Sequence, residues 1–171
     1  RKAVKSKIGF LPIDRKLEGL ALGLDVRANI TMAHIDNMGG GAFLDTTYET
    51  ERCNKWIKDI NIKTSSLDTE VNHLSGGNQQ KIVLAKLLET GSRIFLMNEP
   101  TRGIDVGAKS EIYALMEQLC EAGAGIIMIS SEMPEMLSMA DRILVVSEGR
   151  ITAEYDSEDA DQEKLLSAAT I

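Results

Sequence analysis

The sequence has little of what marks several common classes of protein. Its 171 residues include two cysteines, Cys53 and Cys120, which lie far apart and lack the spacing of a metal or redox site. We expect both to be reduced thiols, as in a cytosolic protein. No apolar run approaches the ~20 residues of a membrane helix, and no signal-peptide pattern is present. If the protein works at a membrane, another chain must span it.

Dense runs of Lys or Arg are also missing, and the formal net charge is -7. This balance argues against a nucleic-acid partner. Hydrophobic residues make up 43% and charged residues 26% of the chain, which is ordinary for one globular domain with a core. His34 and His73 have no companions at metal-ligand spacing.

The last absence concerns phosphate binding. The sequence contains no G-x-x-x-x-G-K-[S/T], the loop that holds the β- and γ-phosphates in P-loop ATPases. The glycines at 39–41 lack the lysine and the following helix, so we expect a loop there. Any phosphate contact made by this chain must therefore come from another stretch.

One stretch has the properties of a helix start that faces a phosphate. It is LSGGNQQK, residues 74–81. Ser75 can cap the helix, and Gly76 and Gly77 have no Cβ, so backbone N–H groups can approach an anion closely. The positive end of the helix that follows, expected over 77–89, points at the same place.

A second stretch delivers a carboxylate. The apolar run at 94–97 predicts a buried strand, and Glu99 follows its end. Open α/β sheets place their chemistry at the carboxyl ends of strands. Residues 100–105 read PTRGID, and the next helix is expected to open at Asp105 or at Val106 just after it.

The rest of the chain predicts strands that alternate with helices, and hence a mainly parallel sheet. We expect strands at 8–11, 125–130 and 142–147, the last forming a hairpin with 150–154 through a turn at 148–149. Helices are expected at 24–35, 47–60 (with Trp56 as a core anchor), 105–122, 131–138 and 162–169, and a loop at 36–47.

Three motifs in this order carry a resemblance. LSGGNQQK, EPTRGIDVGAK and ISSEMPE together resemble the C-terminal cassette of the double-cassette ATP-binding subunits of bacterial sugar importers, of the ribose, galactose and methyl-galactoside type. The likeness runs from about residue 8 to the C-terminus. In that family the phosphate loop lies upstream of the part matched here, so we expect a cassette fragment without it.

The resemblance implies a fold. It is α/β: a partial P-loop NTPase fold of the ABC ATPase kind, with a mainly parallel sheet and a helical subdomain. The helical subdomain would span about 24–90, and the core with Walker B, D-loop and switch about 91–155. A C-terminal helix would occupy about 161–170.

The resemblance also implies roles for individual residues. The cofactors would be ATP and Mg²⁺. Glu99 would polarise the water that attacks the γ-phosphate, Asn98 would occupy the metal-binding position of Walker B, and Ser131 would occupy the switch position. The contacts to ATP would come from the signature stretch and the D-loop: Ser75, Gly76, Gly77, Asn78, Gln79 and Asp105.

Three of the family's positions are weakened in this sequence. Asn98 stands where the family carries Asp, Ser131 where most cassettes carry histidine, and Ile13 where they carry Gln or Glu. Asn keeps an oxygen but loses the charge that Mg²⁺ favours, and Ser cannot carry positive charge. The signature stretch is whole. We therefore expect a cassette that serves the ATP of its partner and hydrolyses its own poorly.

The expected partners follow from the resemblance: a second ATP-binding cassette, membrane permease subunits and, indirectly, a sugar-binding protein. The expected location is peripheral, on the cytoplasmic face of the bacterial inner membrane. Two alternatives stay open. A soluble ABC ATPase of translation or DNA repair would favour basic patches or a coiled-coil insert, neither of which is present, and a non-catalytic docking or regulatory module would have lost ATP binding.

Overall fold

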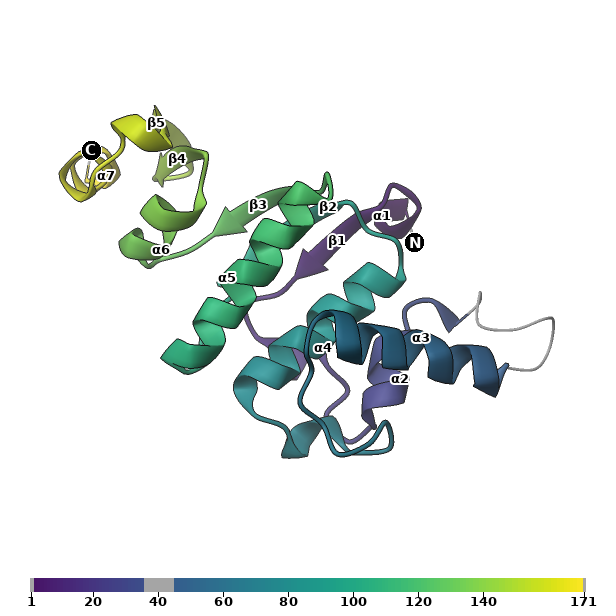
Figure 1. Ribbon diagram of the computed structural model, residues 1–171. Helices are drawn as coiled ribbons and strands as arrows, with labels where there is room; N and C mark the ends of the chain where they lie inside the picture. The colour runs from purple at the N-terminus through teal and green to yellow at the C-terminus, as the bar shows by residue number, and fades with distance from the viewer. Residues whose placement is uncertain (1, 36–44, 171) are drawn as a thin grey trace. The chain divides into compact units, whose positions relative to one another are not determined.

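The computed structural model describes residues 2–35 and 45–170, so most of the loop expected at 36–47 lies outside the described residues. The chain divides into two compact units, Arg1–Ile129 and Ser130–Ile171 (Figure 1). Within the described part, no helix has the length and apolar character needed to cross a membrane.

The first unit is built on three parallel strands. They are β1 (Ile8–Leu11), β2 (Ile94–Asn98) and β3 (Gly125–Ile129), in the order β1-β2-β3. The register places Ile8 beside Ile94, and Ile94 beside Gly125. The parallel sheet expected from the alternation of strands and helices is confirmed for this unit.

Helical elements precede β1 and connect the three strands. Their bounds are α1 (Lys2–Lys5), η1 (Arg15–Gly19), α2 (Val26–Thr31), α3 (Thr46–Asp59), η3 (Val71–His73), α4 (Gly76–Glu89) and α5 (Val106–Glu121). The four longest described helices of the unit begin after a capping side chain that accepts a backbone N–H, supplied by Asp25, Asp45, Ser75 and Asp105. The helix expected at 24–35 is therefore shorter than predicted, whereas α3 agrees with its prediction within a residue.

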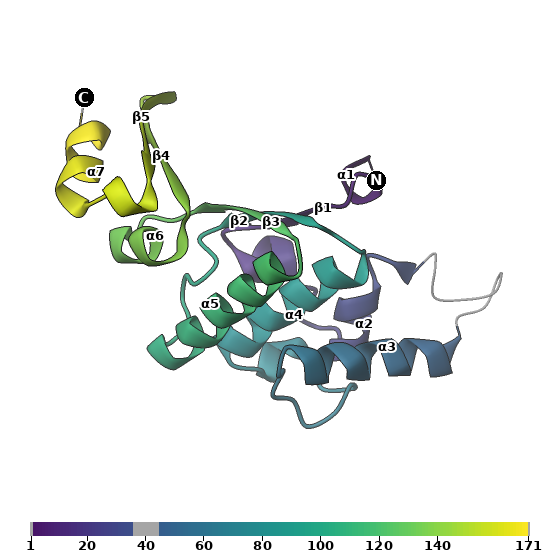
Figure 2. The same ribbon diagram turned by 45° about the horizontal axis from the view of Figure 1, so that its top comes forward.

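The core lies between the sheet and two helices. Helix α4 contacts β1 and α5 contacts β3, and Figure 2 shows both helices on the same side of the strands. Phe95 and Met97 point to this side and are fully buried, as are Ile82 and Leu84 of α4. Burying such side chains contributes about 1.5–3 kcal/mol each.

The opposite face of the sheet corrects the prediction of a buried strand at 94–97, because every second residue there is exposed. Five of the large apolar side chains on this face are exposed by 36–60%: Phe10, Ile94, Leu96, Ile127 and Ile129. Along β2 buried and exposed residues alternate, because successive side chains of a strand point to opposite faces. The continuous apolar run predicts a buried strand, but α4 and α5 cover only one face of the sheet (Figure 2).

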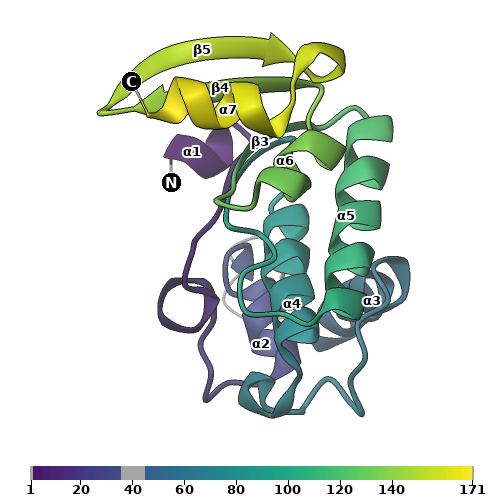
Figure 3. The same cartoon turned by 90° about the vertical axis from the view of Figure 1, so that its left-hand side faces the viewer.

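The second unit is a hairpin covered by helices. It contains α6 (Met133–Met139), β4 (Arg142–Ser147), β5 (Arg150–Asp156), η4 (Ser157–Asp159) and α7 (Gln162–Ala169), with β4 and β5 antiparallel. The turn lies at Glu148 and Gly149, as predicted, and both adopt positive φ. Figure 3 shows α7 lying along the hairpin, where its Leu165 and Ala168 form a small core with Ile143 and Val145.

Candidate functional site

The N-terminal end of α4 presents an exposed hydroxyl. The Ser75 hydroxyl accepts the backbone N–H of Asn78 at 3.4 Å and the side-chain N–H of Asn78 at 2.9 Å. The side-chain oxygen of Asn78, Oδ1, in turn accepts the backbone N–H of Lys63 at 2.7 Å. The 14-residue helix behind this end directs its positive dipole end toward solvent, which favours an anion.

The two glycines of this end have a second reason to be glycine. A Cβ on Gly76 would lie 2.8 Å from Nη2 of Arg15 and 2.9 Å from the carbonyl oxygen of Gly103. A Cβ on Gly77 would lie 2.5 Å from the Cβ of Ala108. The missing side chains therefore let α4 pack closely against the segment that leads into α5. Sequence reasoning gave only the approach of an anion as their reason.

The later residues of the signature stretch are buried. The amide of Gln79 is 4% exposed and donates to the carbonyl of Val71 at 3.2 Å. Lys81 is 3% exposed, and its Nζ donates to the carbonyl of Asn61 at 2.8 Å and to Oε2 of Glu111 at 2.6 Å. These side chains tie α4 to its neighbours. A nucleotide contact by Gln79 stays a prediction.

The turn after β2 carries Glu99 in a left-handed conformation, with φ 51°. The backbone N–H of Glu99 donates to the carbonyl of Ile129 at 2.8 Å, and the N–H of Arg102 closes the turn on the carbonyl of Glu99 at 3.1 Å. Left-handed backbone is costly for residues other than glycine, and strain of this kind gathers at functional sites. Its position after the strand agrees with the predicted carboxylate site.

Asp105 lies at the end of the same segment. Its exposed carboxylate accepts the backbone N–H of Ala108 at 2.9 Å and so caps α5. Since Gly103 touches Gly76, the segment that carries Asp105 lies beside the start of α4. The structure thus brings together two of the predicted stretches: LSGGNQQK at the start of α4 and PTRGID before α5.

Arg15 joins these stretches, and sequence reasoning missed it. Its Nη1 donates to the carbonyl of Arg102 at 2.7 Å and its Nη2 to the carbonyl of Gly103 at 3.0 Å. Arg15 lies 87 positions before Arg102, and in its neighbourhood the sequence had drawn attention only to Ile13. No local pattern could have identified the contact.

The three weakened positions are placed as follows. Asn98 ends β2, is half-buried, and shares its face of the strand with Ile94 and Leu96. Ile13 follows β1 and is 38% exposed. Ser131 is exposed and lies in the second unit, just before α6.

The described residues do not fit Mg²⁺ as a self-contained site. Within residues 2–35 and 45–170 there is no group of three or more His, Cys, Asp or Glu side chains placed to hold a metal ion. Asn98, the predicted ligand, offers a neutral amide where magnesium favours carboxylate oxygen. The N-terminal end of α4, by contrast, suits a phosphate, because the positive end of the helix dipole and the Ser75 hydroxyl both lie there.

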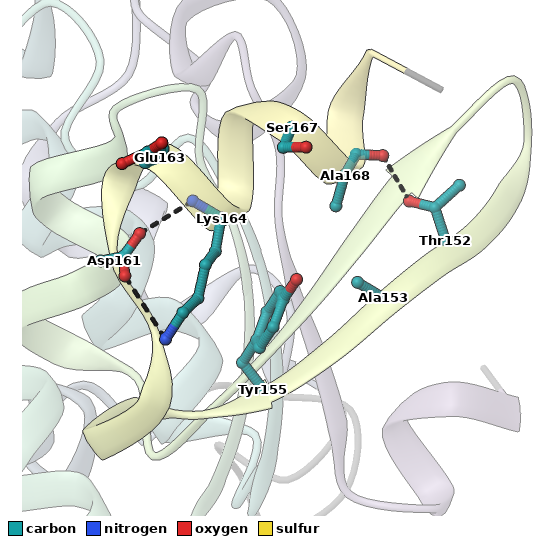
Figure 4. A pocket seen from close by; sticks show the side chains of 8 residues that line it. All are labelled: Thr152, Ala153, Tyr155, Asp161, Glu163, Lys164, Ser167 and Ala168. Atoms are coloured by element: carbon teal, nitrogen blue, oxygen red, sulfur yellow. Dashed lines mark hydrogen bonds and ion pairs between the residues drawn. The ribbon is translucent and has the colours of Figure 1, made fainter.

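An open pocket of about 490 Å³ lies in the second unit, between β5 and α7 (Figure 4). Several of its polar groups are bonded to one another: Nζ of Lys164 lies 3.4 Å from Oδ2 of Asp161, and the Thr152 hydroxyl donates to the carbonyl of Ala168 at 2.8 Å. None of the predicted site residues lines it. We therefore take the start of α4 and the segment before α5 as the candidate site.

A parallel sheet with a glycine-rich helix start and a strand-end carboxylate defines an α/β nucleotide-binding class of protein. The sequence model of the family described as ABC transporter matches residues 1–102, more than half of the chain. The chain belongs to this family, and the resemblance drawn from its three motifs is confirmed.

Curated relatives agree with this family. The chain is 47% identical over 170 residues to the ribose import ATP-binding protein RbsA of Bacillus subtilis, which covers 99% of the chain and 34% of that protein. It is 46% identical to the xylose import ATP-binding protein XylG of Thermoanaerobacter pseudethanolicus and 47% identical to the L-arabinose transport ATP-binding protein AraG of Geobacillus stearothermophilus, covering 98% and 99% of the chain and 33% of each relative. The chain thus spans about a third of the length of these relatives.

Solved structures agree on the fold. An ATP-binding cassette of an ABC transporter superposes with a TM-score of 0.78 at 18% identity, covering 98% of this chain and 70% of that one. An inward-facing putative metal-chelate type ABC transporter gives 0.77 at 18% identity, covering 95% and 63%. The predicted ABC ATPase fold is confirmed.

Proposed function

We propose that this chain is part of the second ATP-binding cassette of a bacterial carbohydrate importer, and that it presents its signature stretch to ATP held by a partner cassette. The single observation that carries the proposal is the exposed, capped start of α4. Ser75 lies at its tip, and the D-loop segment with Asp105 packs beside it. The import roles printed for the ribose, xylose and arabinose relatives support carbohydrate as the cargo.

The chain's own hydrolytic position is proposed to be weak. A unit charge pair 4 Å apart at an effective dielectric of 20 is worth about 4 kcal/mol, and a divalent ion raises that figure. Asn98 forgoes this attraction at the metal position. Glu99 remains at the end of β2 as the candidate for polarising the attacking water, and Ser131 holds the switch position without a positive charge.

The partners and the location follow as further parts of the proposal. The signature end of α4 needs a second cassette that supplies a phosphate loop and Mg²⁺. Since no described helix is fit to cross a membrane, permease subunits would carry the sugar, with an external sugar-binding protein delivering it. The chain would then act peripherally on the cytoplasmic face of the bacterial inner membrane.

A pair of substitutions at Ser75 tests the proposal. Asn and Asp both cap helices well and are nearly equal in size, so Ser75→Asn and Ser75→Asp differ mainly in charge. In the importer assembled with its permease, Ser75→Asp should lower ATP-driven transport at least about tenfold more than Ser75→Asn, because the carboxylate repels the phosphate. Equal transport by the two variants would remove α4 from the nucleotide site.

A second pair of measurements tests whether this chain's own hydrolytic position is weak and the partner cassette holds the ATP that is hydrolysed. Glu99→Gln should change transport little if the neighbouring cassette hydrolyses the ATP, and a strong loss would overturn that part. Calorimetry of this chain with Mg-ATP should show no binding, since the signature end alone holds no phosphate loop. Tight stoichiometric binding would mean that other residues hold the phosphates, and the half-site account would fail.

A further inference from the structure

The guanidinium of Arg15 lies at a junction of three segments. Its two terminal nitrogens donate to consecutive carbonyls, of Arg102 at 2.7 Å and of Gly103 at 3.0 Å. The same group lies against the start of α4, since a Cβ on Gly76 would come within 2.8 Å of Nη2. One side chain therefore holds the D-loop turn and touches the signature stretch.

The element that carries Arg15 is itself fixed at both ends. The Asp14 carboxylate accepts the N–H groups of Lys16 and Leu17, at 2.9 and 3.1 Å, and so caps η1. At the other end the ammonium of Lys86, on α4, donates to the carbonyl of Gly19. A side chain on such a firmly attached element has a fixed origin from which to position the turn.

The hydrogen bonds continue from Arg15 into the turn. The Arg102 carbonyl accepts from Arg15, and the Arg102 N–H donates to the carbonyl of Glu99 at 3.1 Å. Two residues after Gly103, Asp105 caps α5 through the N–H of Ala108 at 2.9 Å. Arg15, which lies 84 positions before Glu99, is thus hydrogen-bonded to the middle of the segment between Glu99 and Asp105.

We propose that Arg15 is a positioning residue. It holds residues 102–105 against the start of α4, so that Asp105 and Ser75 face a partner's nucleotide in one fixed arrangement. The proposal rests on the proposed function for that nucleotide, whereas the positioning itself is a property of this chain. A lysine cannot replace it, because the planar guanidinium spans two carbonyls at once and an ammonium on a flexible stem is a single point of charge.

The first test reads the turn directly. Amide hydrogen exchange followed by nuclear magnetic resonance should show the N–H groups of Arg102 and Ala108 exchanging at least about fivefold faster in Arg15→Lys, the change expected for the loss of one hydrogen bond. The matched reference is Lys164, whose N–H donates to the capping carboxylate of Asp161 at 2.8 Å in the second unit and should not change. Arg142→Lys, an exposed arginine of that unit, is the control variant.

The second test separates positioning from general stability. In the ATPase assembly that contains this chain, Arg15→Lys should lower kcat at least about fivefold with KM for ATP unchanged, because the nucleotide is bound elsewhere but meets a displaced Asp105. Urea unfolding of the chain should shift little. Unchanged exchange at Arg102 and Ala108, or an unchanged kcat, would overturn the proposal. An assembly without ATPase activity even before substitution would contradict the proposed function, while the exchange measurement would still decide the role of Arg15.

Discussion

Gly77 packs so closely against Ala108 that there is no room for a side chain: a Cβ on Gly77 would lie 2.5 Å from the Cβ of Ala108. The first turns of α4 and α5 meet at this point. Because α4 begins with the stretch LSGGNQQK and α5 follows the segment 100–105, the contact fixes the spacing between both parts of the candidate site.

Gly77→Ala should therefore destabilise the chain. Overpacking a close contact costs about 1–3 kcal/mol, which exceeds the roughly 1 kcal/mol that alanine gains over glycine inside a helix. Urea unfolding of Gly77→Ala, Ala108→Gly and the double variant would measure it. The double variant should recover most of the loss caused by Gly77→Ala, and strictly additive free energies would contradict the contact.

The pair of Lys81 and Glu111 makes stability depend on acid pH. The hydrogen bond and charge of Lys81 lower the pKa of Glu111 below its ordinary value of 4.5, with a smaller effect from Lys63. Because the native pKa is the lower one, this stabilisation is complete above about pH 4.5 and is lost as the pH falls through the native pKa. Unfolding free energies measured between pH 6 and 3 should fall less steeply in Glu111→Gln and in Lys81→Met. A slope unchanged in both variants would refute the coupling.

The two cysteines should differ in reactivity. Burial, followed by the charge of Glu49, raises the pKa of Cys53 to about 12, so this thiol stays protonated and inaccessible at pH 8. Cys120 is exposed. A thiol-directed reagent should modify Cys120 in the native chain and Cys53 only after unfolding, because the thiolate is the reactive form. Native labelling should disappear in Cys120→Ser.

Glu89 should be a stability determinant that the single tryptophan reports. Its side chain is 1% exposed; Nη2 of Arg52 lies 3.0 Å from Oε2, and the indole N–H of Trp56 donates to the same oxygen. Glu89→Ala leaves a half-buried guanidinium and an indole without their acceptor, which should cost about 2–4 kcal/mol. Trp56 fluorescence should shift in the native state and report a lower urea midpoint.

Lys55→Ala provides the control for that measurement. The Lys55 ammonium lies 4.0 Å from the centre of the Trp56 ring, so its removal changes the environment of the same fluorophore. A cation–π contact at an exposed site contributes about 0.5–1 kcal/mol. A midpoint that moved as far in Lys55→Ala as in Glu89→Ala would show that the buried carboxylate has no special weight.

The exposed face of the sheet should bind a hydrophobic dye. Ile127 is 60% exposed on this face, whereas Met97 is 1% exposed on the covered one. Ile127→Lys should lower dye binding and change stability by no more than about 0.5 kcal/mol, as surface substitutions usually do. Met97→Lys should unfold the unit, because it buries an unpaired charge. Equal effects of the two substitutions would contradict the assignment of the faces.

Sequence reasoning located the elements where local chemistry marks their ends. Ser75 was predicted to cap its helix because a short polar side chain can accept an N–H of the first turn, and the next helix was expected to open at Asp105 or Val106. The structure confirms both helix starts. The hairpin turn at Glu148 and Gly149 was predicted from a local turn pattern between two strands. These signals lie within a few residues of the feature that they predict.

What the sequence could not predict depends on distant residues. The run at 94–97 is apolar at every position, so it carries no periodicity that distinguishes the covered Phe95 from the exposed Leu96. Arg15 has no local mark of its role, because its two acceptors come from a turn on another strand. The sequence explained Gly76 and Gly77 only by the close approach of an anion. It could not show the second reason, which is that Arg15, Gly103 and Ala108 leave no room for a Cβ.

Four of the eight letters of the signature stretch are buried in this chain: Gly77, Gln79, Gln80 and Lys81. In a scan of all substitutions, these four positions would reduce the amount of protein that accumulates in the cell, whereas Ser75, at the exposed tip, would reduce turnover at normal abundance. Folding and the proposed contact with ATP would therefore constrain different residues of the same stretch. If a cassette no longer used ATP, folding alone would still restrict the residues at half of the positions in this stretch.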